Sequence, residues 1–226
     1  MKTKEAIIIF DKILDLIYPQ VCGICGKINN RSLCNKCNIK LKSEFSFTID
    51  NYNNDLNKNF IEHSYFFKYE NLIRGQIIAL KFHEKPYIYK SISYFLKINK
   101  KCFDYLEKYD IIIVVPISKD REKERGYNQS ILMIKELSNI IDAKIVPNIL
   151  YKIKNTVPQS SLNKIQREEN AKGVYKANDC NNIKNKKILL VDDIYTTGST
   201  INECANVLRQ KGINREQIGV LTIAKD

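Results

Sequence analysis

The chain has 226 residues, of which 44% are hydrophobic and 27% charged. This composition excludes an intrinsically disordered chain, and the length suffices for one α/β domain with a smaller appendage. The formal net charge of +12 favours a partner that carries phosphates, such as nucleic acid, or an anionic surface, although a lysine-rich solvated surface gives the same charge.

The first predicted element is an amphipathic helix over residues 3–17, which ends before Pro19. Asp11, Lys12 and Asp15 interrupt its apolar run too early for a signal peptide or a membrane span. No membrane insertion is therefore expected.

Two C-x-x-C pairs follow the helix, with eight residues between them: Cys22, Cys25, Cys34 and Cys37. This spacing lets four thiolates meet one tetrahedral Zn²⁺, and we predict a structural role because four protein ligands leave no position for water. A redox-active pair or four free thiols are the alternatives. The odd total of seven cysteines argues against a secreted disulfide scaffold and for a cytoplasmic protein, and Cys204 is predicted to be a small core residue.

The Asn-rich stretch 51–60 has the composition of a linker. It predicts a boundary between an N-terminal helix and zinc module, residues 1–50, and a second domain, residues 60–226.

The second domain alternates apolar strands with helical patterns. Strands are predicted at 64–70, 109–116, 186–191 and 217–224, and helices at 71–83 with Asn71 as the cap, 87–98, 128–141 and 199–212. Continuous apolar runs suit strands that are covered on both faces. The pattern predicts an α/β fold with a doubly wound, mainly parallel sheet, in which ligands bind beyond the carboxyl ends of the strands.

An acidic pair and a hydroxyl-rich loop, "VDDIYTTGST", follow the predicted strand at 186–191. Ionised carboxylates accept hydrogen bonds from sugar hydroxyls, so Asp192 and Asp193 are predicted to hold a ribose. A phosphate is held by N–H groups at a helix start and by hydroxyls, which are offered by Thr196, Thr197, Gly198, Ser199 and Thr200. Both halves fit one ribose 5-phosphate, and the alternative is an Asp-rich turn capped by threonine.

This stretch resembles the phosphoribosyl diphosphate signature of type I phosphoribosyltransferases. Together with "VPISKDREKERGYNQS", "TVPQSSLNKIQREENAKGVY", "ALKFH" and the cysteines, it makes the chain similar to the ComF family of competence-associated, phosphoribosyltransferase-like proteins. The resemblance implies a type I phosphoribosyltransferase-like fold, phosphoribosyl diphosphate as a ligand, and Mg²⁺ between its diphosphate and ribose.

The resemblance also implies a set of basic and amide residues for the diphosphate. The Lys/Arg-rich loop at 118–129 carries the family's RGxNQ pattern, although a solvated, charged helix start is the alternative for this segment. Segment 155–173 resembles the mobile loop that closes over the substrate. The residues implied for the diphosphate are Lys81, Arg121, Arg125, Asn128, Gln129 and Gln159, and those implied for catalysis are Asp192, Asp193, Arg125 and Arg167.

Three functions fit these patterns. The first is Mg²⁺-dependent phosphoribosyl transfer to an unknown acceptor; purine salvage is disfavoured because Thr196 stands where those relatives carry an acidic base. The second is a non-catalytic module that binds single-stranded DNA beside a competence helicase or DNA-uptake motor, with the aromatic residues of 64–70 and 87–95 as stacking platforms unless they form core. The third is a sensor that binds the donor without turnover.

Overall fold

A six-stranded sheet forms the centre of the protein, seen here in a computed structural model that describes residues 20–82, 88–126, 128, 130–132, 134, 142–154 and 164–226. The spatial order is β1-β2-β8-β7-β3-β4, and only β1 and β2 pair antiparallel. The predicted α/β fold with a mainly parallel sheet is therefore confirmed. The strands are β1 (Phe45–Asn51), β2 (Glu62–Lys68), β3 (Ile111–Val114), β4 (Lys144–Ile145), β7 (Ile188–Tyr195) and β8 (Ile218–Lys225).

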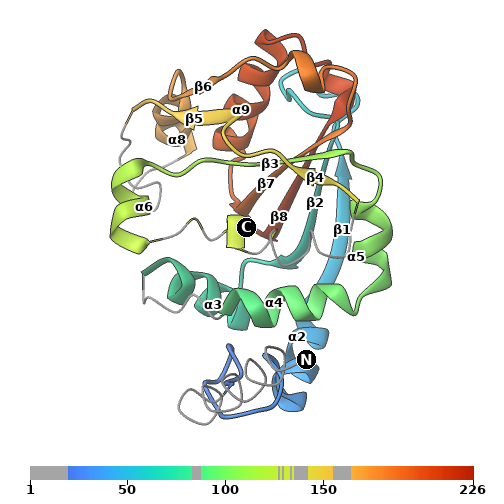
Figure 1. Cartoon of the computed structure of the whole chain (residues 1–226), viewed down its shortest axis with the longest axis vertical. Coiled ribbons are helices and arrows are strands. Elements are labelled where there is room, and N and C mark those ends of the chain that lie inside the picture. Colours follow the sequence, from blue (N-terminus) through green and yellow to red (C-terminus); the bar gives the residue numbers. More distant parts are fainter. Residues whose placement is uncertain are drawn as a thin grey trace, which may run out of the picture.

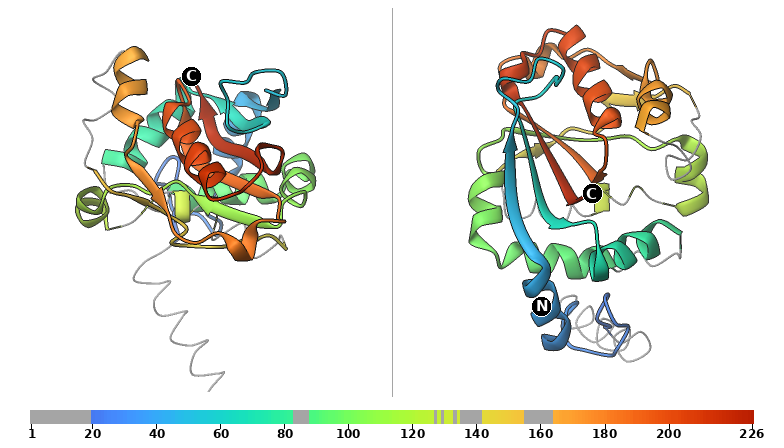
Figure 2. Two further views of the ribbon diagram at one scale, coloured as in Figure 1. Left: turned by 90° about the horizontal axis from the view of Figure 1, so that it is seen from above. Right: turned by 180° about the vertical axis from the view of Figure 1, so that it is seen from behind.

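Helices cover both faces of this sheet (Figures 1 and 2). Leu189 and Val191 of β7 belong to one hydrophobic cluster, and Ile188 and Leu190 to the other. The first cluster includes residues of α3 (Asn71–Phe82), α4 (Ile88–Lys97) and α5 (Lys100–Leu106), and the second includes residues of α9 (Ser199–Gln210). Strand β7 is thus buried on both faces, as its continuous apolar run predicts.

Helix α2 (Asn35–Glu44) joins the cysteine-rich segment to the sheet and caps the next helix. The two carboxylate oxygens of Glu44 accept hydrogen bonds from the backbone N–H groups of Leu72 and Ile73, each at 3.3 Å. The predicted cap, Asn71, is instead the first residue of α3, with φ of +45°. An acidic side chain from a distant element therefore satisfies the free N–H groups at the start of α3.

The stretch 51–60 connects the two strands of a β-hairpin, because β1 before it pairs with β2 after it. Strand β1, which the sequence analysis did not predict, thus places residues 45–51 in the main sheet. The stretch is also anchored by Arg215, which donates to the backbone oxygens of Lys58 at 2.8 Å and Asn53 at 3.1 Å. The division into two domains at this stretch stays a prediction.

A smaller two-stranded sheet, β5 (Leu150–Lys152) with β6 (Tyr175–Ala177), lies beside α9 and was not predicted (Figure 1). Helix α8 (Lys164–Ala171) precedes β6. The Lys/Arg-rich segment predicted as a loop contains helix α6 (Lys119–Arg125), where the Ser118 hydroxyl accepts from the N–H of Arg121 at 3.4 Å and Gly126 ends the helix. The segment is thus a charged helix start, and its role toward a diphosphate stays a prediction.

Two predicted helices fall largely or wholly beyond the described residues. The helix predicted at 3–17 lies outside them, and of the helix at 128–141 the structure describes helical residues 130–132 and 134. Among the helices that are described, none combines the length and the apolar character needed to cross a membrane.

Candidate functional site

The two aspartates predicted to hold ribose lie on β7, which continues through both of them to Tyr195. Asp193 is 5% exposed, and its Oδ1 lies 2.9 Å from Nζ of Lys81 in the last turn of α3. Asp192 faces the opposite side of the sheet, because side chains alternate along a strand. There it lines a hollow together with the first residues of α9. The acidic pair is thus divided between the two faces.

The surroundings of Asp192 disfavour its charged form. Burial, followed by the negative charge of Asp193, raises the pKa of Asp192 to about 7 from an ordinary value of 3.8. The N–H of Asp193 donates to Oδ1 of Asp192 at 2.9 Å, which acts in the opposite direction. Asp192 therefore titrates near neutral pH, and a hydroxyl that donates to it would favour the carboxylate.

The hydroxyl-rich loop forms the turn between β7 and α9. Gly198, with φ of +74°, immediately precedes the 12 residues of α9. Oγ1 of Thr197 and Oγ of Ser199 lie 2.9 Å apart. The N–H groups and the dipole at a helix start favour an anion at this place. The hollow here is lined by Asp192, Ile194, Thr196, Gly198, Ser199, Thr200 and Ile201.

The ring of Tyr195 packs against this loop at Gly198. A Cβ atom at Gly198 would lie 2.6 Å from Cε2 of Tyr195, so ring and backbone are in direct contact. The same ring stacks on His63 with a centroid distance of 4.1 Å and an interplanar angle of 21°. His63 is fully buried, and its Nε2 lies 2.8 Å from Oγ1 of Thr222. Burial, followed by the charge of Lys225, lowers the pKa of His63 to about 3, so the supporting ring is neutral.

Two lysines act on the acidic pair, and an arginine lies near one of them. Lys81, predicted from its position after an apolar helix, contacts Asp193 on one face. On the other face the positive charges of Arg121 and Lys152 act on each other, and Lys152 also acts on Asp192. Arg121 was predicted, whereas Lys152 was not, because it lies on a three-residue strand that carries no periodic signal.

Asn128 of the predicted diphosphate set is 6% exposed. Its Nδ2 donates to the carbonyl of Val115 at 3.2 Å, and its Oδ1 accepts from the N–H of Ser130 at 3.0 Å. The side chain thus joins the end of β3 to the helical residues that follow. Its predicted contact with a diphosphate stays a prediction.

Several predicted site residues cannot be placed. Gln129 and Gln159 lie outside the described residues. Arg125 ends α6 and Arg167 lies within α8, but the side chains of both are outside the described part of the chain. Their roles stay predictions.

The four cysteines of the two C-x-x-C pairs converge. Their sulfur atoms all lie within 4.8 Å of one another, and those of Cys25 and Cys34 are 3.9 Å apart. A tetrahedron with Zn–S bonds of about 2.3 Å has edges of about 3.8 Å, so this arrangement fits a Cys₄ zinc site. The backbone N–H of Gly23 donates to Oγ of Ser91 in α4 at 2.9 Å, so this segment packs on the main domain.

Comparisons with known proteins agree with this geometry. Residues 127–226 match the family described as phosphoribosyl transferase domain. Competence protein F of Haemophilus influenzae is 32% identical over 146 residues, which cover 63% of this chain and 64% of that protein. Competence protein ComFC of Bacillus subtilis is 31% identical over 108 residues, 48% of this chain and 42% of that protein. DNA utilization protein YhgH of Escherichia coli K12 is 28% identical over 148 residues, 64% of each chain.

The matched regions span less than two thirds of each of these relatives. The parallel sheet, the loop between β7 and α9, and the domain match define a phosphoribosyltransferase-like protein. Four converging cysteines precede that fold. Within the class, the matched part of the chain is similar to the competence proteins F and ComFC.

Proposed function

We propose that this protein binds phosphoribosyl diphosphate, or its ribose 5-phosphate part, with Mg²⁺ and acts in DNA uptake by competent cells. The observation that carries the proposal is that Asp192 and residues 196–200 line one hollow at the N-terminus of α9. A carboxylate accepts from ribose hydroxyls, and N–H groups and hydroxyls donate to a phosphate. The lining of the hollow thus offers groups complementary to both the ribose and the phosphate of one ligand.

The diphosphate of the donor would need cations, because negative charge develops on it when it leaves the ribose. Lys81 lies beside Asp193, and Arg121 lies near enough to Lys152 for their charges to interact, so both are suited to this part. Mg²⁺ supplies further neutralisation when it is bound, and it keeps waters and phosphate oxygens as ligands, so no all-protein cage is required. The oxygen-rich lining of the hollow is compatible with that coordination.

The role in DNA uptake is supported by the names of the relatives, which are competence proteins and a DNA utilization protein. The acceptor is open. Thr196, which lines the hollow, cannot take a proton from a nucleobase at neutral pH. An acceptor that needs no base from this position is therefore favoured over a purine.

Titration calorimetry with phosphoribosyl diphosphate and Mg²⁺ tests the binding. Asp192→Asn should weaken binding at least tenfold, because the amide presents donors in place of one acceptor oxygen. Asp104→Asn, on the exposed side of α5, is the matched control and should bind as the wild type does. Equal affinity for the wild type and Asp192→Asn would remove the basis of the ribose assignment.

Transfer itself is tested by mass spectrometry of mixtures that contain the protein, donor, Mg²⁺ and candidate acceptors, single-stranded DNA included. A mass increase of one ribose phosphate on an acceptor, absent with Asp192→Asn, is expected for an enzyme. Tight donor binding without any adduct would instead indicate a sensor.

A second candidate function is binding of single-stranded DNA. Of the aromatic residues predicted as platforms, Phe66, Phe67 and Phe95 are buried in the core. A second hollow, however, lies at the carboxyl ends of β2 and β8. It is lined by Tyr65, Lys68, Tyr69, Glu70, Lys225 and Asp226. Its tyrosine rings suit stacked bases, and its lysines suit phosphates.

Fluorescence anisotropy of a labelled oligothymidine at several salt concentrations tests this candidate. Tyr69→Leu and Lys68→Met should each weaken binding, and Lys68→Met should also reduce the salt dependence. Tyr151→Leu, an exposed tyrosine on β5, is the control. Variants at positions 68 and 69 that bind the strand as well as the wild type does would exclude this hollow as the strand's site.

A further inference from the structure

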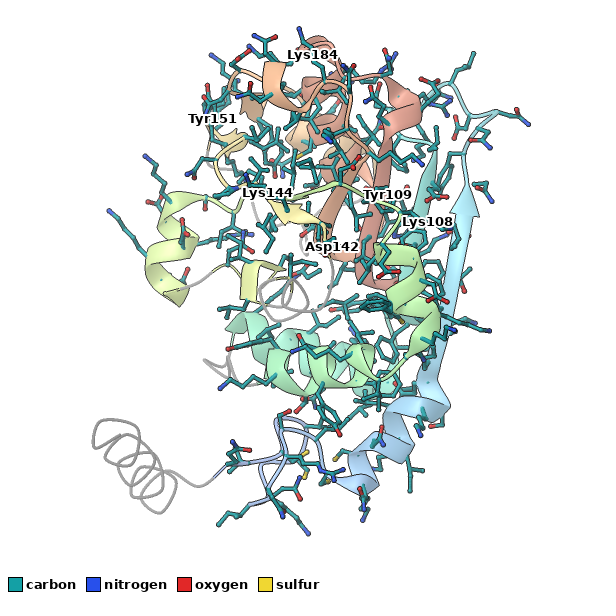
Figure 3. All side chains as sticks on the ribbon, turned by 45° about the vertical axis from the view of Figure 1, so that its right-hand side comes forward. Lys108, Tyr109, Asp142, Lys144, Tyr151 and Lys184 are labelled. Atoms are coloured by element: carbon teal, nitrogen blue, oxygen red, sulfur yellow. The ribbon has the colours of Figure 1, made fainter. Side chains whose placement is uncertain are left out.

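The small sheet β5–β6 packs beside α9. Lys152 on β5 pairs with Tyr175 on β6 in the antiparallel register, and β6 contacts α9. Tyr151, the neighbour of Lys152, is 40% exposed and points to the outside (Figure 3). Because side chains alternate along a strand, Lys152 points to the inner side, toward the hollow that holds Asp192.

Tyr175 connects this small sheet to the phosphate loop. It is 7% exposed, and the side chain of Thr200 lies close enough to its hydroxyl to lower its pKa. Burial raises the pKa of Tyr175 well above its ordinary value, so the phenol stays protonated. The ring also lies 5.9 Å, centroid to Nζ, from the ammonium group of Lys152. One aromatic side chain therefore contacts both a residue of the phosphate loop and a lysine.

Lys152 is a half-buried cation among groups of mixed charge. Burial lowers its pKa, as does the charge of Arg121 on α6, while the carboxylate of Asp192 on β7 acts in the opposite direction. An ammonium group that has lost part of its water gains most from a new anionic ligand. A phosphate dianion beside Thr200 would supply that ligand.

A bound phosphate would also need this cation. It would place negative charge near the carboxylate of Asp192, and the start of α9 offers only about half a unit of positive charge in compensation. Lys81 also acts on Asp192, but its ammonium group is already engaged by Asp193 at 2.9 Å. Lys152 lies on the same face as the phosphate loop.

We propose that Lys152 binds a phosphate oxygen of the ligand in this hollow, and that Tyr175 positions both Lys152 and Thr200 for that contact. The inference rests on the proposed binding of a ribose phosphate and adds a residue from the β5–β6 sheet to that site. The site is then enclosed by residues from β7, α9 and β5–β6.

Equilibrium binding of ribose 5-phosphate, measured by calorimetry, tests the proposal. Lys152→Met should weaken binding about tenfold to hundredfold, or about 1.4 to 2.8 kcal/mol at 1.4 kcal/mol per factor of ten. Lys152→Arg, which keeps the charge, should remain within about threefold of the wild type. Lys176→Met is the matched control, because Lys176 is exposed on the neighbouring strand β6 and lies opposite Tyr151.

Tyr175→Phe keeps the ring and removes the hydroxyl that faces Thr200, so it should weaken binding less than Lys152→Met does and should fold even if the methionine variant does not. Inorganic phosphate as a second probe should show the same order of affinities, because the contact is to phosphate alone. Wild-type affinity in both Lys152→Met and Tyr175→Phe, or equal losses in Lys152→Met and Lys176→Met, overturns this inference and leaves the proposed function standing. A wild-type protein that binds neither ribose 5-phosphate nor phosphoribosyl diphosphate overturns both.

Discussion

Replacing Gly198 by alanine probes the phosphate loop with a single methyl group. The residue has φ of +74°, and the new Cβ would lie 2.6 Å from Cε2 of Tyr195. The left-handed conformation costs a residue with a side chain about 1–2 kcal/mol. The Tyr195 ring cannot easily yield, because it stacks on the buried His63 at 4.1 Å, and overpacking of this kind costs about 1–3 kcal/mol more.

The two contributions together predict a penalty of roughly 2–5 kcal/mol for the loop in its native conformation. If the loop keeps this conformation, chemical unfolding should show the penalty as lost stability. If the loop moves to escape it, the affinity for ribose 5-phosphate should fall by a factor of about 30 or more, since 1.4 kcal/mol corresponds to a factor of ten. Denaturation curves and calorimetry of the same sample therefore show whether the penalty appears as lost stability or as lost affinity.

Gly173→Ala is the matched control. Gly173 also has positive φ, at +64°, but a Cβ atom there would meet nothing within 4 Å. This variant should lose only the conformational part, about 1–2 kcal/mol of stability, and should bind ribose 5-phosphate normally. A Gly198→Ala protein that matches Gly173→Ala in both measurements would refute the close packing of Tyr195 against the loop.

Three further predictions concern the charges and the metal. Because the pKa of Asp192 is raised from 3.8 to about 7 on folding, the folded state binds the extra proton between these values. The stability of the wild type relative to Asp192→Asn should therefore fall by about 4 kcal/mol as pH rises from 4 to 8 in urea titrations, and a constant difference would contradict the shift. Lys81→Met should destabilise the protein by about 3 kcal/mol, because it leaves the buried Asp193 without its cation. The double variant with Asp193→Asn should regain most of this stability, and a double variant that loses the sum of the two single losses would argue against the ion pair. Chelation of zinc should increase hydrogen exchange first in residues 20–44 and then in α4 around Ser91, and unchanged protection would contradict the structural role of the metal.

The strands and helices with continuous apolar runs or helical periodicity could be predicted from the sequence. Examples are β7, β8, α3 and α9, each of which lies within a few residues of its predicted range. Strand β1 was missed although Phe45, Phe47 and Ile49 alternate with polar residues, because the segment is short and adjoins a cysteine-rich module. The strands β4, β5 and β6 have two or three residues each, which is too few for periodicity to be detected.

The candidate site could be predicted as a set of residues but not as an arrangement. The sequence indicates Asp192 for the ribose and residues 196–200 for the phosphate, because these residues are close together along the chain and also line one hollow. It predicts that Asp192 and Asp193 act together, whereas in the structure Asp193 contacts Lys81 of α3 and Asp192 lines the hollow at the start of α9 on the other face of the sheet. The contact of His63 with Tyr195 depends on strand order, which local patterns do not encode.

The position of β8 has a consequence for how the chain is made. Residues 218–225 lie between β2 and β7 in the sheet, and seven of these eight residues are buried. On the ribosome, β2 and β7 emerge before the strand that joins them. The nascent protein must therefore carry the open edge of β2 through most of its synthesis, and that of β7 until β8 is made. These edges are the surfaces on which association with other unfinished chains would begin.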